Sequence, residues 1–254
     1  MTDLVVAVLL GLVSGILAGL FGVGGGIVMT PGIQVLLGTA PIVALATPLP
    51  VILPTAIAGA LTYRKAGEID EHAALWMAVP GIAAAALGAA LTRVIDTHLL
   101  LVVTALLLAY QAFGILRGRR KGVQRSERAA GRGTYAGIGL VAGLISGLLG
   151  IGGGLIMVPL LAGWLGMPLK RALGTSLLAI VVLVIPGTIV HTALGHIDWE
   201  IFLAVTLGAV PGALIGARIA LGSQERTLRL AVGSFLLVVA VAYGATEAAT
   251  LLRG

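Results

Sequence analysis

Two stretches of sequence decide the fold: GLFGVGGGIVMTP at 19–31 and GLLGIGGGLIMVP at 147–159. Each places a run of three glycines inside an apolar segment, and the two stretches are 128 residues apart. Aligned at that offset without a gap, 12–38 and 140–166 match at 13 of 27 positions. Such a match indicates an internal repeat.

The register of this repeat extends well beyond the glycines. At the same offset Thr47 aligns with Thr175, and the G-x-I-D motif of 67–70 aligns with that of 195–198. A register kept over this length predicts a duplicated chain.

The composition excludes a soluble globular protein. Of the 254 residues 59% are hydrophobic and 10% are charged, whereas soluble domains carry about 25% charged residues. The absence of cysteine excludes disulfides and thiolate metal ligands, and the four histidines form no metal motif. The net charge of +6 does not indicate nucleic acid, because seven of the 16 Lys and Arg residues lie in one linker between apolar segments.

Apolar segments recur along nearly the whole chain, and a straight crossing of the bilayer needs about 20 residues, with a range of about 17 to 25. The first segment follows Thr2 and Asp3 rather than a basic region, so we interpret it as a mature helix and not as a signal peptide. Two segments directly after the glycine runs, 27–37 and 155–165, have only 11 residues each. The longer segments are 4–20, 42–63, 73–91, 99–116, 135–149, 173–193, 201–217 and 228–252.

The basic residues predict the orientation. Cytoplasmic loops are enriched in Lys and Arg, which places inside the basic linker 117–133 between a first repeat at 1–116 and a second at 134–254. If each glycine-interrupted unit enters and returns on one side, 14 of the 16 basic residues are cytoplasmic, against 10 if each unit crosses once. The first path inverts one repeat relative to the other and leaves both termini outside.

The fold class that these patterns predict is an all-α polytopic membrane protein. It has two inverted-topology repeats and about 8–10 membrane segments, some of them short helices broken by glycine. Two similar halves in opposite orientations are typical of secondary transporters, because exchanging their conformations opens the centre to opposite faces.

The glycine runs predict an anion site. A break in mid-bilayer leaves backbone groups unpaired, at several kcal/mol each, unless protein or a water-filled cavity satisfies them. The short helix after each break begins with free N–H groups and a partial positive charge, which suits an anion. The residues that we expect at this site are Gly22, Gly24, Gly25, Gly26, Ile27, Gln34, Thr47, Gly150, Gly152, Gly153, Gly154, Leu155, Thr175 and Ser176.

Structural interpretations compete with this site. The hydroxyls of Thr47, Thr175 and Ser176 could bond to their own helix carbonyls, and Gln34, which aligns with an alanine, either breaks the symmetry of the site or lies at its rim. Three consecutive glycines weaken a helix by about 1 kcal/mol each relative to Ala, which close packing rarely requires. Close helix packing is nevertheless the role that we expect for glycines at four-residue spacing: Gly11, Gly15, Gly19, Gly139, Gly143 and Gly147.

The remaining polar residues have simpler interpretations. The three tryptophans are expected as interfacial anchors, and Asp70 and Asp198 as turn or cap residues. His191 is expected at the interface, with a proton-coupled role left open. Glu247 lies inside an apolar run, where an acid suggests function.

The duplicated motif, followed by ATP at 46–48 and by GTS at 174–176, resembles the sulfite exporter TauE/SafE family of membrane permeases. The resemblance covers essentially the whole chain. It implies an inner-membrane carrier that exports small sulfur-containing or organic anions, such as sulfite, sulfoacetate or other C2 sulfonates. The first half has the tripeptide Ala-Thr-Pro where the second has Gly-Thr-Ser, so we expect more hydroxyl contacts to the substrate from the second half.

The function that we predict is export of such an anion across the bacterial inner membrane by alternating access, without catalytic residues, metal or cofactor. An anion channel is the first alternative. An intramembrane enzyme is the second, although the apolar segments contain no Ser–His, Cys–His, paired-acid or metal constellation. The expected partners are a small anion and the lipid bilayer, with a homodimer as one option for the assembly and no nucleic acid.

Overall fold

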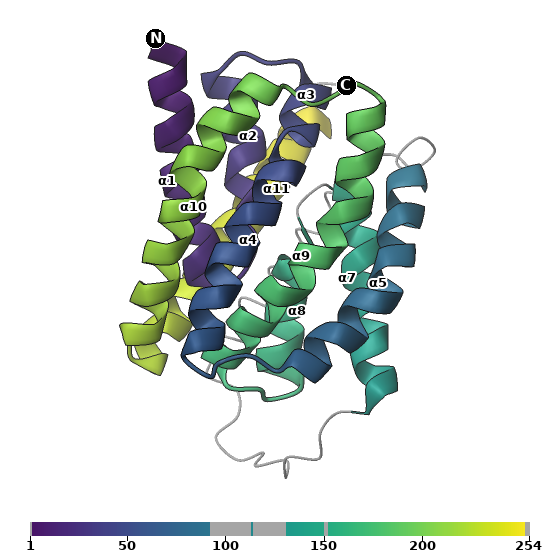
Figure 1. Cartoon of the computed structure of the whole chain (residues 1–254), viewed down its shortest axis with the longest axis vertical. Coiled ribbons are helices and arrows are strands. Elements are labelled where there is room, and N and C mark those ends of the chain that lie inside the picture. Colours follow the sequence, from purple (N-terminus) through teal and green to yellow (C-terminus); the bar gives the residue numbers. More distant parts are fainter. Residues whose placement is uncertain (1, 92–112, 114–130, 150–151, 252–254) are drawn as a thin grey trace.

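A computed structural model describes residues 2–91, 113, 131–149 and 152–251, and within these ranges the regular elements are all helices (Figure 1). Most of the predicted segment 99–116 and of the linker 117–133 lies outside the described residues. Within the described ranges, five helical stretches are long and apolar enough to cross a membrane: Asp3–Phe21, Ile42–Lys65, Glu71–Leu91, Leu169–Ala193 and Trp199–Gly222.

The helices of the first repeat each have a counterpart at the same offset in the second repeat. The first repeat contains α1 (Thr2–Phe21), α2 (Gly26–Leu36), α3 (Pro41–Ala46), α4 (Pro48–Lys65) and α5 (Glu71–Leu91). The second contains α7 (Arg132–Leu149), α8 (Gly154–Pro159), the π-helical η1 (Leu160–Trp164), α9 (Leu169–Ala193), α10 (Trp199–Gly222) and α11 (Glu225–Leu251). Thus α1 corresponds to α7, α2 to α8 with η1, α3 and α4 to α9, and α5 to α10.

Corresponding helices run in opposite directions. In Figure 1 α1 begins at the top and runs downward, whereas α7 begins at the bottom and runs upward, and α4 and α9 are opposed in the same way. The all-α polytopic fold with inverted repeats is therefore confirmed.

Glycine faces interlock the two repeats. α1 packs in parallel against α10, and α7 packs in parallel against α5. A Cβ atom on Gly15 would overlap the carbonyl oxygen of Ala209, and one on Gly143 would overlap that of Gly81. The glycines at four-residue spacing are thus confirmed as packing residues: Gly11, Gly15, Gly19, Gly139, Gly143 and Gly147.

The first glycine break turns the chain back along α1. In the first repeat, Gly25 has a φ of 83° and packs beside Ser14, while Gly32, farther along α2, packs against Leu10. Later residues of α2 thus contact earlier residues of α1, so the two helices are antiparallel. The unit is a helical hairpin.

The second repeat begins the same return. Gly153 has a φ of 74° and packs against Ala142 and Ser146 of α7, which are the counterparts of Ser14 and Ala18. Gly150 and Ile151, at the start of this break, lie outside the described residues.

The predicted segment 42–63 is confirmed as part of the membrane-spanning candidate Ile42–Lys65, within which α3 and α4 meet at Thr47. Pro48 begins α4, and proline lacks the N–H that an uninterrupted helix uses and clashes with the carbonyl four residues earlier. The corresponding residue of α9 is Ser176, and α9 continues without interruption from Leu169 to Ala193.

We predict that Gly139→Ala lowers the midpoint of thermal unfolding in detergent. The new Cβ would overlap the carbonyl oxygen of Met77, and overpacking of this kind costs about 1–3 kcal/mol. Gly137→Ala is the matched control on the same helix, because nothing lies within 4 Å of its Cβ position. Equal midpoints for the two variants would contradict the close α5–α7 contact.

Candidate anion site at the paired glycine breaks

The two glycine breaks meet inside the bundle. A Cβ atom on Gly154 would overlap the carbonyl oxygen of Gly22 and lie 2.8 Å from the Cα atom of Val23. The left-handed Gly25 and Gly153 are the N-caps of α2 and α8. The start of α8 therefore touches the backbone of the break that precedes α2.

Two equivalent isoleucines lie between the breaks. A Cβ atom on Gly24 would lie 3.1 Å from Cγ2 of Ile52 and 3.5 Å from Cγ2 of Ile180. One on Gly152 would lie 3.4 Å from Cγ2 of Ile180 and 3.7 Å from Cγ2 of Ile52. Both isoleucines are fully buried. They come from α4 and α9 and form an apolar barrier on which both breaks close.

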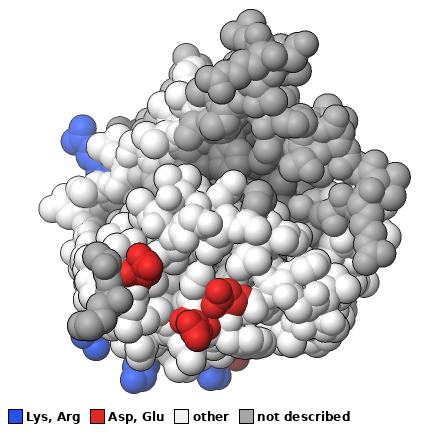
Figure 2. Space-filling view, turned by 90° about the horizontal axis from the view of Figure 1, so that it is seen from above, with Lys and Arg blue, Asp and Glu red and all other residues white. Residues whose placement is uncertain are grey.

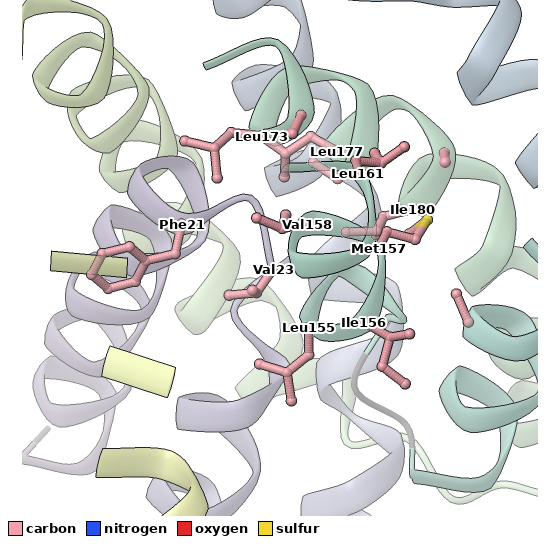
Figure 3. Close-up of a cluster of buried hydrophobic side chains, with 14 of the residues drawn as sticks. Phe21, Val23, Leu155, Ile156, Met157, Val158, Leu161, Leu173, Leu177 and Ile180 are labelled. Carbon is pink, nitrogen blue, oxygen red and sulfur yellow. The ribbon is translucent and has the colours of Figure 1, made fainter. Parts of the chain in front are cut away.

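The side chains around the breaks form a buried apolar cluster. In Figure 3 Val23 of the first break faces the helix that carries Leu155 and Val158, and Ile180 lies beside Met157. Ile27 and Leu155, whose backbone N–H groups belong to the predicted site, are buried with their side chains in this cluster. In this conformation buried apolar side chains fill the space between the breaks.

Thr47 and Thr175 each accept a hydrogen bond from the other repeat. The backbone N–H of Asp70 donates to Oγ1 of Thr175 over 2.9 Å, and that of Asp198 donates to Oγ1 of Thr47 over 3.2 Å. Both threonines are buried. Figure 1 shows the α4–α5 turn at the bottom and the α9–α10 turn at the top, so these two cross-repeat bonds brace opposite ends of the bundle.

The two aspartates also hold their own turns. Oδ1 of Asp70 accepts from the N–H of Ala73 over 2.8 Å, and Oδ1 of Asp198 caps α10 by accepting from Glu200 and Ile201 over 3.0 Å each. The prediction that Asp70 and Asp198 are turn or cap residues is confirmed.

Ser176 fixes the backbone of the first break. Its hydroxyl lies 2.8 Å from the carbonyl oxygen of Gly22 and 2.9 Å from that of Leu173, and it donates toward both. The counterpart of Ser176 is Pro48, which has no hydroxyl. A hydroxyl of the second repeat therefore bonds the break of the first repeat, and Pro48 cannot make the equivalent bond to the second break.

Gln34 is not brought to the breaks. It is exposed on α2, eight residues beyond Gly26, which corresponds to about 12 Å along a helix. Sequence reasoning missed Ser14, which is fully buried beside Gly25 and has no hydrogen-bond partner for its hydroxyl in the described part of the chain. Its counterpart is Ala142, so the repeat gave no signal for a polar residue there.

The other singled-out residues lie near helix ends or in α11. Trp76 lies in the second turn of α5, where the guanidinium of Arg132 sits 5.2 Å from the centre of its ring, and Trp199 begins α10. Trp164 ends η1. Glu247 belongs to α11, and its side chain lies outside the described residues.

An apolar groove of about 420 Å³ runs between α4, α5 and α9, away from the glycine breaks. Leu61, Leu75 and Val181 are among its lining residues. Among the described residues that line it, the charged ones are Arg64 and Glu71, which form an ion pair of 2.8 Å. The groove therefore offers no uncompensated positive charge to an anion.

Together these features define a class: a polytopic α-helical membrane protein made of two inverted, interlocked repeats that meet at paired backbone breaks. The model of the sulfite exporter TauE/SafE family matches residues 7–243. The chain belongs to this family, as the glycine motifs predicted.

Relatives of similar length match over most of the chain. A probable membrane transporter protein of Xylella fastidiosa (strain Temecula1) is 30% identical, covering 94% of this chain and 94% of its own. YunE and YdhB of Bacillus subtilis, also described as probable membrane transporter proteins, are 29% and 32% identical; the matches cover 92% and 80% of this chain and 95% and 85% of theirs. No solved structure matches. Family and relatives identify a membrane transporter.

We predict that Thr175→Val and Thr47→Val each destabilise the protein by about 0.5–1.5 kcal/mol, because the part-buried N–H of the facing turn loses its acceptor. Thr62→Val on α4 is the control, since its hydroxyl donates only to the carbonyl of Ala58 within the same helix. Thermal unfolding in detergent measures all three. A Thr62→Val variant as unstable as the other two would argue against a special role for the cross-repeat bonds.

Proposed function

We propose that the chain exports a small sulfur-containing or organic anion, such as sulfite, sulfoacetate or another C2 sulfonate, across the bacterial inner membrane by alternating access. The substrate binds between the paired glycine breaks, against the N-terminal ends of α2 and of the helix formed by α8 and η1. An inside-negative potential drives anion export by about 2.3 kcal/mol per charge at 100 mV.

The observation that carries this proposal is the contact between the breaks. Gly154 meets Gly22, and Ile52 and Ile180 close on both breaks. Helix N-termini with free N–H groups bind anions, and a buried, water-poor setting strengthens that attraction. When the two isoleucines separate, the anion takes their place against the exposed backbone.

The cross-repeat bonds suit alternating access. Each end of the bundle has one such bond, from Asp70 to Thr175 and from Asp198 to Thr47. Breaking one while the other holds opens a single face. Each threonine hydroxyl accepts in the closed form and still carries one hydrogen that it can donate to an anion.

The charge distribution supports an orientation with the linker 117–133 in the cytoplasm and both termini in the periplasm. The Lys and Arg residues in the described ranges lie near helix ends at the bottom of Figure 1: Arg64, Lys65, Arg132, Lys170, Arg171, Arg218, Arg226 and Arg229. Cytoplasmic faces are enriched in such residues. α1 begins and α11 ends at the opposite face.

We predict that Gly24→Ala and Gly152→Ala abolish or strongly slow export of radiolabelled sulfite or sulfoacetate from proteoliposomes. Both glycines have a φ of 81°, so alanine is strained by about 1–2 kcal/mol, and the new methyl group fills the space between the breaks. Gly38→Ala and Gly166→Ala are matched controls, with φ of 62° and 72° and nothing within 4 Å of the Cβ position.

Export by the two control variants should stay close to that of the unmodified protein, because they bear the same backbone strain away from the breaks. If all four variants are impaired equally, or if Gly24→Ala and Gly152→Ala transport normally, the site is not between the breaks. Saturation and counterflow exchange support a carrier, whereas single-channel currents would support the alternative of an anion channel.

The proposed orientation can be tested by labelling, because the chain has no cysteine of its own. Glu200 and Gln224 are both exposed and lie near opposite ends of α10. We expect a membrane-impermeant maleimide to label Glu200→Cys in intact cells, and Gln224→Cys only after permeabilisation. The reverse pattern would invert the proposed topology.

A further inference from the structure

Two histidines approach each other at the end of the bundle opposite the Lys and Arg residues of the described ranges. His191 lies in the last turn of α9 and His196 in the turn before α10. Their Nδ1 atoms are 3.2 Å apart, and their ring centres are 5.4 Å apart. The His-x4-His spacing is not in itself a metal motif, so the pair arises from the fold of the turn.

We propose that His191 and His196 bind one divalent transition-metal ion, such as Zn²⁺, through both Nδ1 atoms. In a tetrahedral site with Zn–N bonds of about 2.0–2.1 Å, two imidazole nitrogens are about 3.3 Å apart. The separation of 3.2 Å is thus suited to a shared ion with little movement of either ring.

The turn holds the pair in place without a metal. The backbone N–H of His196 donates to the carbonyl oxygen of His191 over 3.1 Å, and Asp198 two residues later is tied to Thr47. In the metal-free form the rings share one proton between their Nδ1 atoms. Moving that hydrogen to Nε2 of the same ring frees both Nδ1 atoms as ligands, and the net charge of the two neutral rings is unchanged.

The surroundings favour a cation. At this end of the described structure the charged residues are the acids Asp3, Asp198 and Glu200, and Figure 2 shows acidic side chains on this face, with Lys and Arg only at its edge. In the first repeat the two counterparts are Tyr63 and Glu68. That repeat has no histidine pair, so the site belongs to one face only.

The ion would be held reversibly rather than as a structural metal. In the described ranges no group of three or more His, Cys, Asp or Glu side chains is placed to hold a metal. The histidines therefore supply two positions and water fills the others. Both histidines are partly exposed, which gives the ion a direct route from solvent.

The test is titration of the purified, tag-free full chain with Zn²⁺ by calorimetry. We expect one ion per chain, and an affinity at least about tenfold weaker in His191→Gln and in His196→Gln, since loss of a direct ligand costs no less than loss of an outer-shell partner. His72→Gln is the control, because its ring lies 6.2 Å from that of Trp76 and 6.3 Å from that of Tyr135 near the basic end.

Electron paramagnetic resonance of bound Cu²⁺, which binds such nitrogen sites more tightly than Zn²⁺, reports the ligands directly. We expect coupling to two imidazole nitrogens in the unmodified chain and to one in either single variant. Metal-free unfolding midpoints show that the variants are folded. Equal affinity in all four proteins, loss of binding only in His72→Gln, or no binding by the unmodified chain would each overturn the proposal. None of these readouts depends on what the protein transports.

Discussion

The structure depends on backbone-to-backbone contact at glycine faces. Between helices in lipid the hydrophobic effect contributes little, so association relies on close packing and hydrogen bonds. Gly15 against Ala209 and Gly143 against Gly81 bring such backbones together. In each pair one helix comes from each repeat, so α1 with α10 and α5 with α7 form two closely packed pairs that join the repeats. α4 and α9, which carry the isoleucine barrier and the braced threonines, lie between them.

Much of this architecture follows from sequence, because its physical causes are local and repeated. A glycine every four residues marks a packing face, a run of three marks a break, and the distribution of Lys and Arg favours a returning path over a crossing one. Each signal occurs twice, 128 residues apart, so chance is a poor explanation for it. The two repeats differ locally at Pro48, which separates α3 from α4 within the predicted segment 42–63.

The details of the candidate site follow from sequence less well. The partners of Thr47 and Thr175 lie 151 and 105 residues away in the other repeat, and no local pattern specifies such a bond. Ile52 and Ile180 were missed because an apolar residue in an apolar segment carries no chemical signal. Gln34 is polar and therefore a candidate from sequence, yet it lies on an exposed face of α2. Histidines five residues apart meet only because the chain reverses between them.

The difference between Pro48 and Ser176 has a consequence for the two halves. Pro48 separates α3 from α4 near one end of the proposed pathway, while its counterpart Ser176 donates a hydrogen bond to the carbonyl oxygen of Gly22 in the first break. The first repeat thus has an interrupted helix, and the second has a continuous helix that is hydrogen-bonded to the first break. Under the proposed cycle, the inward-open and outward-open forms then differ in free energy. The resting protein therefore populates one of these two conformations more than the other, although its repeats are nearly symmetric.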